Sequence, residues 1–449
     1  MSLDLAGRLW NPGRELMPAQ ALHDLQLGRL KHQLAYNWAF SPFHRRTFER
    51  AGARPEDIKD FDDFARLPLM DKEDHRAVQA ESIAEHGDPY ALFAAAPRDA
   101  IVRINATSGT TGDPTLYTLT AHDVAVVNEM HARKYWRAGV RPADVMLQAL
   151  SLSMFTGGLP LSQGIQHLGA AVVLVGIEGG SRRVLEFARL TKANALIATP
   201  SFGRHLIEEC EAITGLPATE LGIRRFFCAG EPGGGDPEVR RILAGGFGTE
   251  VYDHTGGGHT FHGISCDHGA AMHFVSPDYC LLELIVPENR APIDMADGAV
   301  GEMVWTFLDW RGGPFMRYAI GDIAEVLTAP CPCGLPGLRF RILGRADDML
   351  IVKGVNVYPQ AIGNVIAGFV PRLTGAFRVV LDRPGPLVEP PLRIRLEHGE
   401  DADDLRALEA DLAAALREQL RVSPAFEWLA PRTLPREAMK TKLIEIEAS

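Results

Sequence analysis

The pattern of apolar and polar residues changes along the chain and divides it into regions. Residues 23–51 carry apolar side chains at helical spacing, and a further short helix is expected from Pro55 onward. From about residue 101 to residue 260, short apolar runs alternate with helix-length segments, which predicts a largely parallel sheet covered by helices on both faces. The strand-like runs are residues 170–176, 195–199 and 225–229, and the helix-like segments are residues 181–190 and 202–213.

The last third of the chain has a different pattern. Residues 281–286 and 301–306 are separated by Pro, Asn, Asp and Gly, which predicts hairpins of an antiparallel sheet or small barrel. A compact unit then follows, with strands near residues 377–381 and 392–396 and a helix within residues 401–421, whose leucines recur on one face. We therefore expect a multi-domain α/β protein. Its large N-terminal domain (residues 1–346) would hold mostly parallel sheets and a small antiparallel β subdomain, and its small mobile α+β C-terminal domain would span residues 347–449.

The composition is that of a globular protein, since 46% of the 449 residues are hydrophobic and 23% are charged. A formal net charge of −11 argues against nucleic acid or an anionic membrane as the main partner. The chain begins without a basic and then apolar leader pattern, and no segment approaches the roughly 18 apolar residues of a membrane span. We expect a cytoplasmic protein, for which a homodimer is the default state.

The most specific local signal is a dense run of glycines and hydroxyl side chains directly after the apolar residues 101–104. Glycine lets backbone N–H groups turn toward an anion, and Ser and Thr add donors, so such a loop can bind phosphate oxygens. It lacks the Gly-Lys-Ser/Thr ending of a Walker A loop, and Asp113 stands where a lysine is expected. By composition alone an ordinary surface loop fits equally well. The loop residues are Thr107, Ser108, Gly109, Thr110, Thr111 and Gly112.

Further motifs follow in a fixed order. They are Phe155-Thr-Gly-Gly158, Ala229-Gly-Glu-Pro232, Tyr252-Asp-His-Thr255, Arg317-Tyr-Ala-Ile-Gly-Asp322, Gly344-Arg-Ala-Asp-Asp-Met349, Lys353-Gly-Val-Asn-Val-Tyr-Pro359 and Pro435-Arg-Glu-Ala-Met-Lys440. With the loop, this order resembles the adenylate-forming enzymes, and more narrowly the phenylacetate-CoA ligase branch. The resemblance covers nearly the whole chain. It implies that a carboxylic acid reacts with ATP to give an acyl-adenylate, from which a thiol then displaces AMP.

The resemblance assigns nucleotide-binding roles to these motifs. The loop of residues 107–112 would lie over the β- and γ-phosphates, and Asp322 would accept hydrogen bonds from the ribose hydroxyls. Arg345 would contact the nucleotide as well. The adenine-binding segments would be the motif of Ala229, Gly230, Glu231 and Pro232 and the motif of Tyr252, Asp253 and Thr255.

Two positions depart from the family pattern. Asp113 replaces the usual lysine at the end of the phosphate loop, and Gly256 replaces a glutamate that helps to hold Mg²⁺. Mg²⁺ is still expected because the charge that develops on the phosphates has to be neutralised, but either Asp253, His254 or water supplies the ligand, or the ATP phosphates hold the ion.

The C-terminal motifs imply a moving domain. Lys440 matches the lysine that bridges the attacking carboxylate and the α-phosphate, with Lys442 as a rival by proximity. Asp347 matches the hinge of the domain rotation. After rotation, Lys353, Gly354 and Tyr358 would help to form the CoA channel, where a glycine permits a close approach.

The acyl pocket is expected around the Phe155 motif and the strand that ends near Thr255. His259 and His262 crowd the glycine-rich stretch after His254, and one of the three histidines is a candidate contact of the substrate carboxylate. The predicted pocket residues are Met154, Phe155, Gly157, Gly158, Ala229 and His254.

Six cysteines are too few for a disulfide scaffold in a chain of this length. Cys331-Pro-Cys333 is a knuckle-like pair, and with Cys266 and His273 it offers three thiolates and an imidazole, which suit tetrahedral Zn²⁺. His268 is an alternative to His273. The other cysteines, Cys210, Cys228 and Cys280, are predicted to be buried hydrophobic residues.

These features together predict an AMP-forming acid-CoA ligase that uses ATP, Mg²⁺ and CoA and acts on an aryl or arylacetic acid. Three alternatives stay open: transfer to a carrier-protein thiol, a short branched or hydroxy acid as substrate, and a non-catalytic nucleotide-binding protein. The last is raised by the altered positions Asp113 and Gly256.

Overall fold

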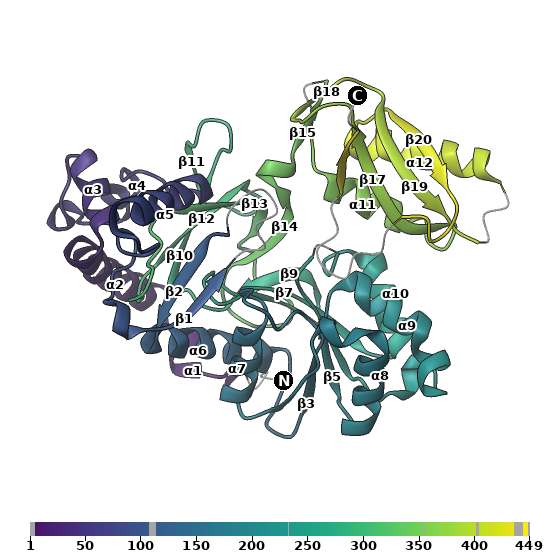
Figure 1. Cartoon of the computed structure of the whole chain (residues 1–449), viewed down its shortest axis with the longest axis horizontal. Helices are drawn as coiled ribbons and strands as arrows, with labels where there is room; N and C mark the ends of the chain where they lie inside the picture. Colours follow the sequence, from purple (N-terminus) through teal and green to yellow (C-terminus); the bar gives the residue numbers. More distant parts are fainter. Residues whose placement is uncertain are drawn as a thin grey trace.

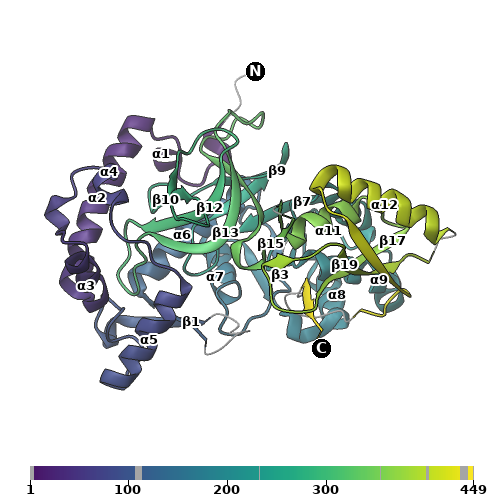
Figure 2. The ribbon, with the colours of Figure 1, turned by 90° about the horizontal axis from the view of Figure 1, so that it is seen from above.

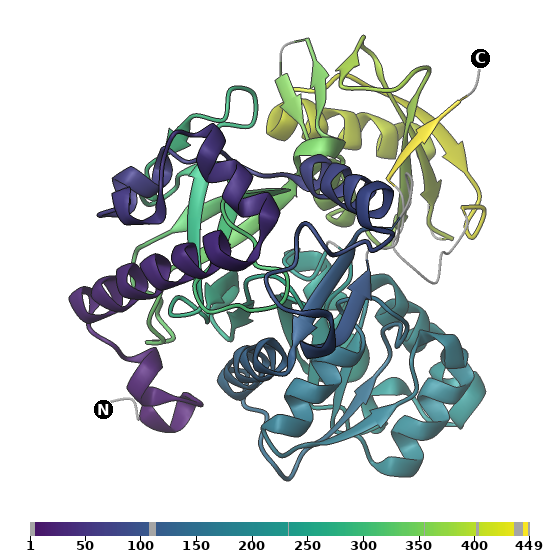
Figure 3. The ribbon, with the colours of Figure 1, turned by 60° about the vertical axis from the view of Figure 1, so that its left-hand side comes forward.

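A computed structural model describes residues 5–106, 114–231, 233–353, 355–400, 404–434 and 443–447. The N-terminal helices (purple) lie beside the antiparallel strands, helices α8–α10 cover the parallel strands, and the last hundred residues (yellow-green) form a separate unit (Figure 1). Figure 3 shows the same three parts after a turn of 60°. The chain is thus a multi-domain α/β protein, as the sequence predicts.

The helices largely coincide with the helical patterns in the sequence. Side-chain caps fix several starts: Thr120 and Asp123 form a capping box at α6, and Thr199 and Asp236 cap α9 and α10. The helices are α1 (Pro12–Glu15), α2 (Ala19–Phe40), α3 (Pro42–Arg50), α4 (Phe61–Ala65), α5 (Lys72–His86), α6 (Ala121–Arg137), α7 (Leu159–His167), α8 (Gly180–Thr191), α9 (Pro200–Thr214), α10 (Pro237–Phe247), α11 (Pro359–Ala367) and α12 (Leu405–Leu420).

One 12-stranded sheet forms the centre of the molecule, in the order β11-β10-β12-β13-β14-β9-β8-β7-β6-β5-β3-β4. Its strands are β3 (Val145–Gln148), β4 (Ala171–Leu174), β5 (Ala195–Ala198), β6 (Arg225–Cys228), β7 (Glu250–Thr255), β8 (Gly263–Cys266), β9 (Gly269–Phe274), β10 (Cys280–Ile285), β11 (Pro292–Ile293), β12 (Val300–Phe307), β13 (Tyr318–Leu327) and β14 (Arg339–Arg345). A separate antiparallel pair is formed by β1 (Ile101–Ala106) and β2 (Leu116–Thr120).

The parallel strands β4, β3, β5, β6 and β7 bring their carboxyl ends to one edge of the sheet. The Ala229 motif directly follows β6, the Tyr252 motif forms the end of β7, and the Phe155 motif lies in the segment between β3 and α7, so the topology gathers them at this edge. Ligands of open α/β sheets bind at the carboxyl ends of the strands.

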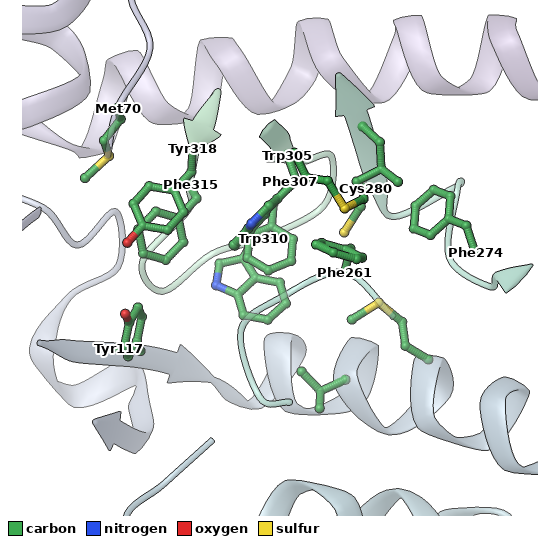
Figure 4. Packing of buried hydrophobic residues seen from close by; sticks show 14 of the residues in the cluster. Met70, Tyr117, Phe261, Phe274, Cys280, Trp305, Phe307, Trp310, Phe315 and Tyr318 are labelled. Carbon is green, nitrogen blue, oxygen red and sulfur yellow. The ribbon is translucent and has the colours of Figure 1, made fainter. Parts of the chain in front are cut away.

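The antiparallel strands continue this sheet and do not form a detached subdomain. The chain turns back after β7, because β8 pairs antiparallel with β7 and β9 pairs with both β8 and β14. A large aromatic core covers the antiparallel strands, in which Phe307 and Trp310 stack 3.8 Å apart and Trp305 packs nearby (Figure 4).

The C-terminal unit has its own hydrophobic core, made only of residues from Leu350 onward. Strands β20, β19, β17 and β21 form one small sheet, and β16, β15 and β18 form another. Seen from above, this unit overlaps α8 and α9 in projection (Figure 2). Arg204 of α9 donates a hydrogen bond to the carbonyl of Thr374 in it. The strands are β15 (Leu350–Val352), β16 (Val355–Val357), β17 (Leu373–Leu381), β18 (Leu387–Val388), β19 (Leu392–His398), β20 (Pro424–Leu429) and β21 (Ile444–Ile446).

Among the helices of the described ranges, none combines the length and the apolar character that a membrane crossing requires.

Candidate active site and metal centre

Three motif segments contact one another at the carboxyl edge of the parallel strands. The Ala106 amide donates to the carbonyl of Met154 (3.0 Å), and the Gly258 amide donates to the carbonyl of Thr156 (2.9 Å). The end of β1, which leads into the predicted phosphate loop, therefore lies against the Phe155 motif and the turn after β7. The loop itself, Thr107 to Gly112 with Asp113, lies outside the described residues.

The Ala229 motif follows β6 at the same edge. Glu231 accepts a hydrogen bond from the Ser201 amide at the start of α9 (2.6 Å), and burial raises the pKa of this carboxyl group. Gly230 has a φ of 86°, a backbone conformation that favours glycine. The hydrogen bond of Glu231 thus links this segment to the start of α9, while Pro232 lies outside the described residues.

Neighbouring residues of β7 point to opposite faces of the sheet. Tyr252 is 7% exposed and packs on Phe227, and its hydroxyl donates to Glu250 (3.1 Å). Asp253 faces the glycines before α10, and burial raises its pKa to about 7, opposed by Arg240. Roles for both residues in binding the nucleotide stay predictions.

Three predicted residues at the domain junction form one ion-pair cluster. Arg345 donates to Asp322 (2.9 Å) and to Asp347 (2.8 and 3.1 Å), and it also donates to the carbonyl of Ile320 (3.0 Å). Asp322 and Arg345 are register partners in β13 and β14. The predicted ribose ligand, nucleotide arginine and hinge residue therefore meet at one point.

The predicted CoA-channel residues lie just beyond this cluster. Tyr358 packs against Gly344, where a Cβ would approach the tyrosine Cβ within 2.9 Å. Lys353 is exposed and has a φ of 51°. Gly354, Lys440 and Lys442 lie outside the described residues, so their roles stay predictions.

The predicted acyl-pocket residues surround the turn after β7. Met154 is 53% exposed, Phe155 is half-buried, and Gly158 and His254 are buried. The side-chain amide of Gln148 donates to the carbonyl of Gly158 (3.3 Å), which connects this segment to the end of β3. Gly157 also belongs to this segment and is half-buried.

Beneath this turn lies a group of buried polar side chains that we call the polar cluster: His131, Lys134, His254 and His262. His131 and Lys134 come from α6, and the sequence analysis did not single them out. Their burial could have been inferred from their spacing in the sequence, because they share the apolar face of α6 with Val127 and Met130. His259 lies elsewhere, stacked on Tyr117 at 3.6 Å.

The Cys/His cluster is a second group of ligand-type side chains. One ligand atom from each of Cys266, His273, Cys331 and Cys333 lies within 4.8 Å of all the others. The Cys266 and Cys331 sulfurs are 3.7 Å apart, close to the ~3.8 Å expected between two thiolates of a tetrahedral zinc site with Zn–S bonds of about 2.3 Å. His268, the alternative ligand, is exposed beside Asp267.

Burial shifts the pKa values of the groups in this cluster. Burial raises the pKa of the Cys266 and Cys333 thiols and lowers the pKa of His273 to about 4. A metal ion would stabilise the thiolates and the neutral imidazole that such a site requires. The other three cysteines are buried in hydrophobic clusters, as predicted.

Comparison with known proteins agrees with these features. The AMP-binding enzyme C-terminal domain matches residues 354–445. The phenylacetate-coenzyme A ligase of Thermus thermophilus is 32% identical over 447 residues, covering 95% of this chain and 97% of the relative. The phenylacetate-coenzyme A ligase of Escherichia coli is 30% identical and covers 85% of this chain and 84% of the relative.

Solved structures of 2-hydroxyisobutyryl-CoA ligase are also similar. In the postadenylation state with a hydroxyisobutyryl adenylate, that enzyme is 28% identical and matches with a TM-score of 0.87 over 100% of this chain and 94% of its own. In the thioesterification state the TM-score is 0.70, with 99% and 93% covered. The parts of this chain are therefore arranged more like the postadenylation state.

Proposed function

The chain belongs to the phenylacetate-CoA ligase family, and we therefore propose that it is an ATP-dependent acid-CoA ligase. It joins a carboxylic acid to CoA through an acyl-adenylate and releases AMP and pyrophosphate. The observation that carries the proposal is the contact of the Phe155 motif, the end of β1 and the turn after β7 at one sheet edge. The end of β1, from which the predicted phosphate loop continues, contacts the segment predicted to line the acyl pocket.

The residues divide the work of the first half-reaction. The loop of residues 107–112 donates hydrogen bonds to the phosphates, and Asp322 accepts hydrogen bonds from the ribose hydroxyls. Arg345 keeps the Asp322 carboxylate in place, since it donates to that carboxylate at 2.9 Å. Lys440 neutralises the charge that grows between the acid and the α-phosphate. Mg²⁺ supplies further charge neutralisation on the phosphates, and we assign it no protein ligand.

We propose that the molecule has two domains, residues 1–346 and 347–449, with Asp347 as the hinge. The separate core of the C-terminal unit supports this division. The ion pairs of Arg345 with Asp347 hold the hinge in its present arrangement. Rotation about Asp347 changes these contacts and turns Lys353, Gly354 and Tyr358 toward the thiol of CoA.

The acid is proposed to be an aryl or arylacetic acid, because the curated relatives above are phenylacetate-coenzyme A ligases. A short hydroxy acid is the second candidate. It is favoured by the similarity to 2-hydroxyisobutyryl-CoA ligase and by the polar side chains beneath the turn after β7.

We further infer that the Cys/His cluster holds a structural zinc ion. Its four ligand atoms converge, and β8, β9 and the segment around Cys331 would be cross-linked by the ion. The site lies apart from the phosphate and acyl segments, and no step of the reaction is assigned to it.

The function is tested with purified protein, ATP, Mg²⁺, CoA and a panel of acids, by measuring the nucleotide released and the thioester formed. We expect AMP and an acyl-CoA, whereas release of ADP contradicts the mechanism. AMP formation that is equal with and without CoA, and without thioester, favours transfer to a carrier-protein thiol. If no acid gives AMP, the result favours the alternative of a non-catalytic nucleotide-binding protein.

Lys440→Ala sharpens this test, with Lys442→Ala as the matched control two residues away. We expect the first variant to lose adenylation by a factor of about 100 or more and the second to keep it. The reverse result would assign the role to Lys442.

A further inference from the structure

The polar cluster of His131, Lys134, His254 and His262 is unusual because charged and polar groups rarely lie fully inside a protein without partners. Lys134, His131 and His262 are 0% exposed, and His254 is 5% exposed. The rings of His131 and His262 are 4.3 Å apart, and the Lys134 ammonium lies 5.2 Å from the Tyr135 ring. Lys134 also interacts electrostatically with all three histidines, so the four side chains lie close together.

Lys134 is directed at the turn after β7. Its ammonium donates to the carbonyls of Thr255 (3.3 Å) and Gly256 (3.2 Å). Two of its three N–H donors are used in this way, and one remains. Within the ranges that the structure describes, Lys134 forms no ion pair with any carboxylate.

Several neighbouring polar atoms have no hydrogen-bond partner among the described residues. The unpartnered atoms are both ring nitrogens of His131, both ring nitrogens of His254, Nδ1 of His262 and the Tyr135 hydroxyl. Each unpartnered buried group costs about 1–3 kcal/mol. Such a concentration of unused donors and acceptors indicates that a polar group binds here.

A metal ion is a poor fit for this group. Among the described residues, the Cys/His cluster is the one set of His, Cys, Asp and Glu side chains whose ligand atoms converge. The three imidazoles of the polar cluster do not converge in this way, and the neighbouring Lys134 ammonium would repel a cation.

The polar cluster lies against the predicted acyl pocket. His262 contacts the carbonyl of Gly257 (2.9 Å), and Gly258 donates to Thr156 of the Phe155 motif. A Cβ at Gly257 would meet the Thr156 backbone at 2.7 Å. The turn after β7 thus has the Phe155 motif and the polar cluster as immediate neighbours.

We propose that Lys134, with the imidazoles of His131 and His262, binds an oxygen substituent of the acid, so that the preferred substrate is a hydroxy acid. This inference rests on the proposed ligase function and specifies its substrate. The remaining Lys134 N–H donates to the hydroxyl oxygen, and a neutral imidazole nitrogen accepts the hydroxyl proton. An unsubstituted acid leaves these groups unpaired, which is the basis of strong discrimination against it.

The position of the substituent follows from the contacts of Lys134. Thr255, whose carbonyl Lys134 contacts, belongs to the segment predicted to bind the nucleotide, where the acid is activated. The hydroxyl therefore lies on the carbon next to the reacting carboxylate and not at the far end of a long acyl group.

The experiment compares matched acids on the full-length enzyme with ATP, Mg²⁺ and CoA. The pairs are 2-hydroxyisobutyrate with isobutyrate and mandelate with phenylacetate, and 4-hydroxyphenylacetate carries a distant hydroxyl. In the wild type we expect kcat/KM to favour the 2-hydroxy acid by about 100-fold or more in at least one pair. In Lys134→Met this preference should fall to within about threefold.

Lys31→Met is the matched control, because it makes the same chemical change on the exposed face of α2 and should keep the wild-type preference. Lys134→Gln is the second variant. It retains N–H donors without the charge, so it should keep an intermediate preference and decides the question if Lys134→Met does not fold.

Equal kcat/KM within both pairs in the wild type overturns the inference but leaves the ligase function intact. A full preference in folded Lys134→Met, or in Lys134→Gln if only that variant folds, overturns it as well. A Lys134-dependent preference for 4-hydroxyphenylacetate contradicts the placement beside the carboxylate. Absence of AMP with every acid instead removes the proposed function on which the inference rests.

Discussion

The Cys/His cluster and the polar cluster are both buried groups of side chains that can bind ligands, but their geometries differ. In the Cys/His cluster, one atom from each of four residues lies within 4.8 Å of the others. In the polar cluster, a lysine donates to two backbone carbonyls and the imidazoles keep unpartnered nitrogens. In the first arrangement the ligand atoms converge on one point, whereas in the second the unpartnered polar atoms do not converge.

This difference shows why residue type alone does not identify a site. Histidines occur in both clusters, but a metal requires ligand atoms that converge at bonding distance. An organic ligand requires donors and acceptors that are spread over its surface. The sign of the local charge differs too, because thiolates attract a cation and a lysine ammonium attracts an oxygen acceptor.

The largest expected effect is on the Cys/His cluster. Cys333→Ser should lower zinc affinity by a factor of about 100 or more, because even changes to residues behind the metal ligands cost about 10–100-fold. That factor corresponds to about 2.7 kcal/mol of stability for the zinc-bound protein at saturating metal. Zinc analysis and thermal unfolding measure both effects.

Cys210→Ser is the matched control, since it also changes a buried cysteine but lies in a hydrophobic cluster. It should retain about one zinc per chain by the proposed stoichiometry. Full zinc retention in Cys333→Ser would contradict the site.

The next effect concerns pH and the polar cluster. Burial holds the pKa of His131 well below its ordinary value, so the unfolded state binds a proton that the folded state does not. The contribution of the neutral imidazole to the free energy of unfolding is therefore fully present above about pH 6.5. It is lost as the pH falls toward the pKa of the folded state. Lowering the pH from 7 to 5 should therefore reduce the free energy of unfolding by about 2 kcal/mol through this histidine.

His131→Phe should remove that share of the pH dependence, measured as the free energy of unfolding at both pH values. Tyr135→Phe removes a neighbouring polar group without removing an imidazole and should keep the wild-type dependence. An unchanged pH dependence in His131→Phe would show that the pKa of this imidazole is the same in the folded and unfolded states, which contradicts the prediction.

The smallest effect has the opposite sign. Lys134→Met should raise the free energy of unfolding by about 1 kcal/mol at pH 7 without substrate, because a buried ammonium is replaced by an apolar chain of similar size. Burial also holds the pKa of Lys134 well below its ordinary value. Lys31→Met should change stability by less than about 0.5 kcal/mol.

Denaturant unfolding at pH 7 measures this change. Clear destabilisation by Lys134→Met indicates that its two hydrogen bonds to carbonyls outweigh the desolvation. The polar cluster would then stabilise the fold in the absence of substrate, as the Cys/His cluster does with zinc.

Much of the fold could be predicted from the sequence because the patterns are local. The runs 195–199 and 225–229 became β5 and β6, and residues 401–421 contain α12. The Cys331-Pro-Cys333 pair also places two sulfurs close together by covalent connection. Continuity between the parallel and antiparallel strands was not predictable, because it depends on the pairing of β9 with β14, which are far apart in the chain.

Residue identity and short spacing were enough to establish the family, the order of the motifs and the candidate zinc ligands. The folded chain was needed to show which of these residues meet. It joins Asp322, Arg345 and Asp347 in one ion-pair cluster and places His273, not His268, beside the cysteines. It also directs Lys134 from the apolar face of α6 toward the turn after β7. Long-range packing sets such contacts, and no local pattern encodes the distance between side chains far apart in the chain.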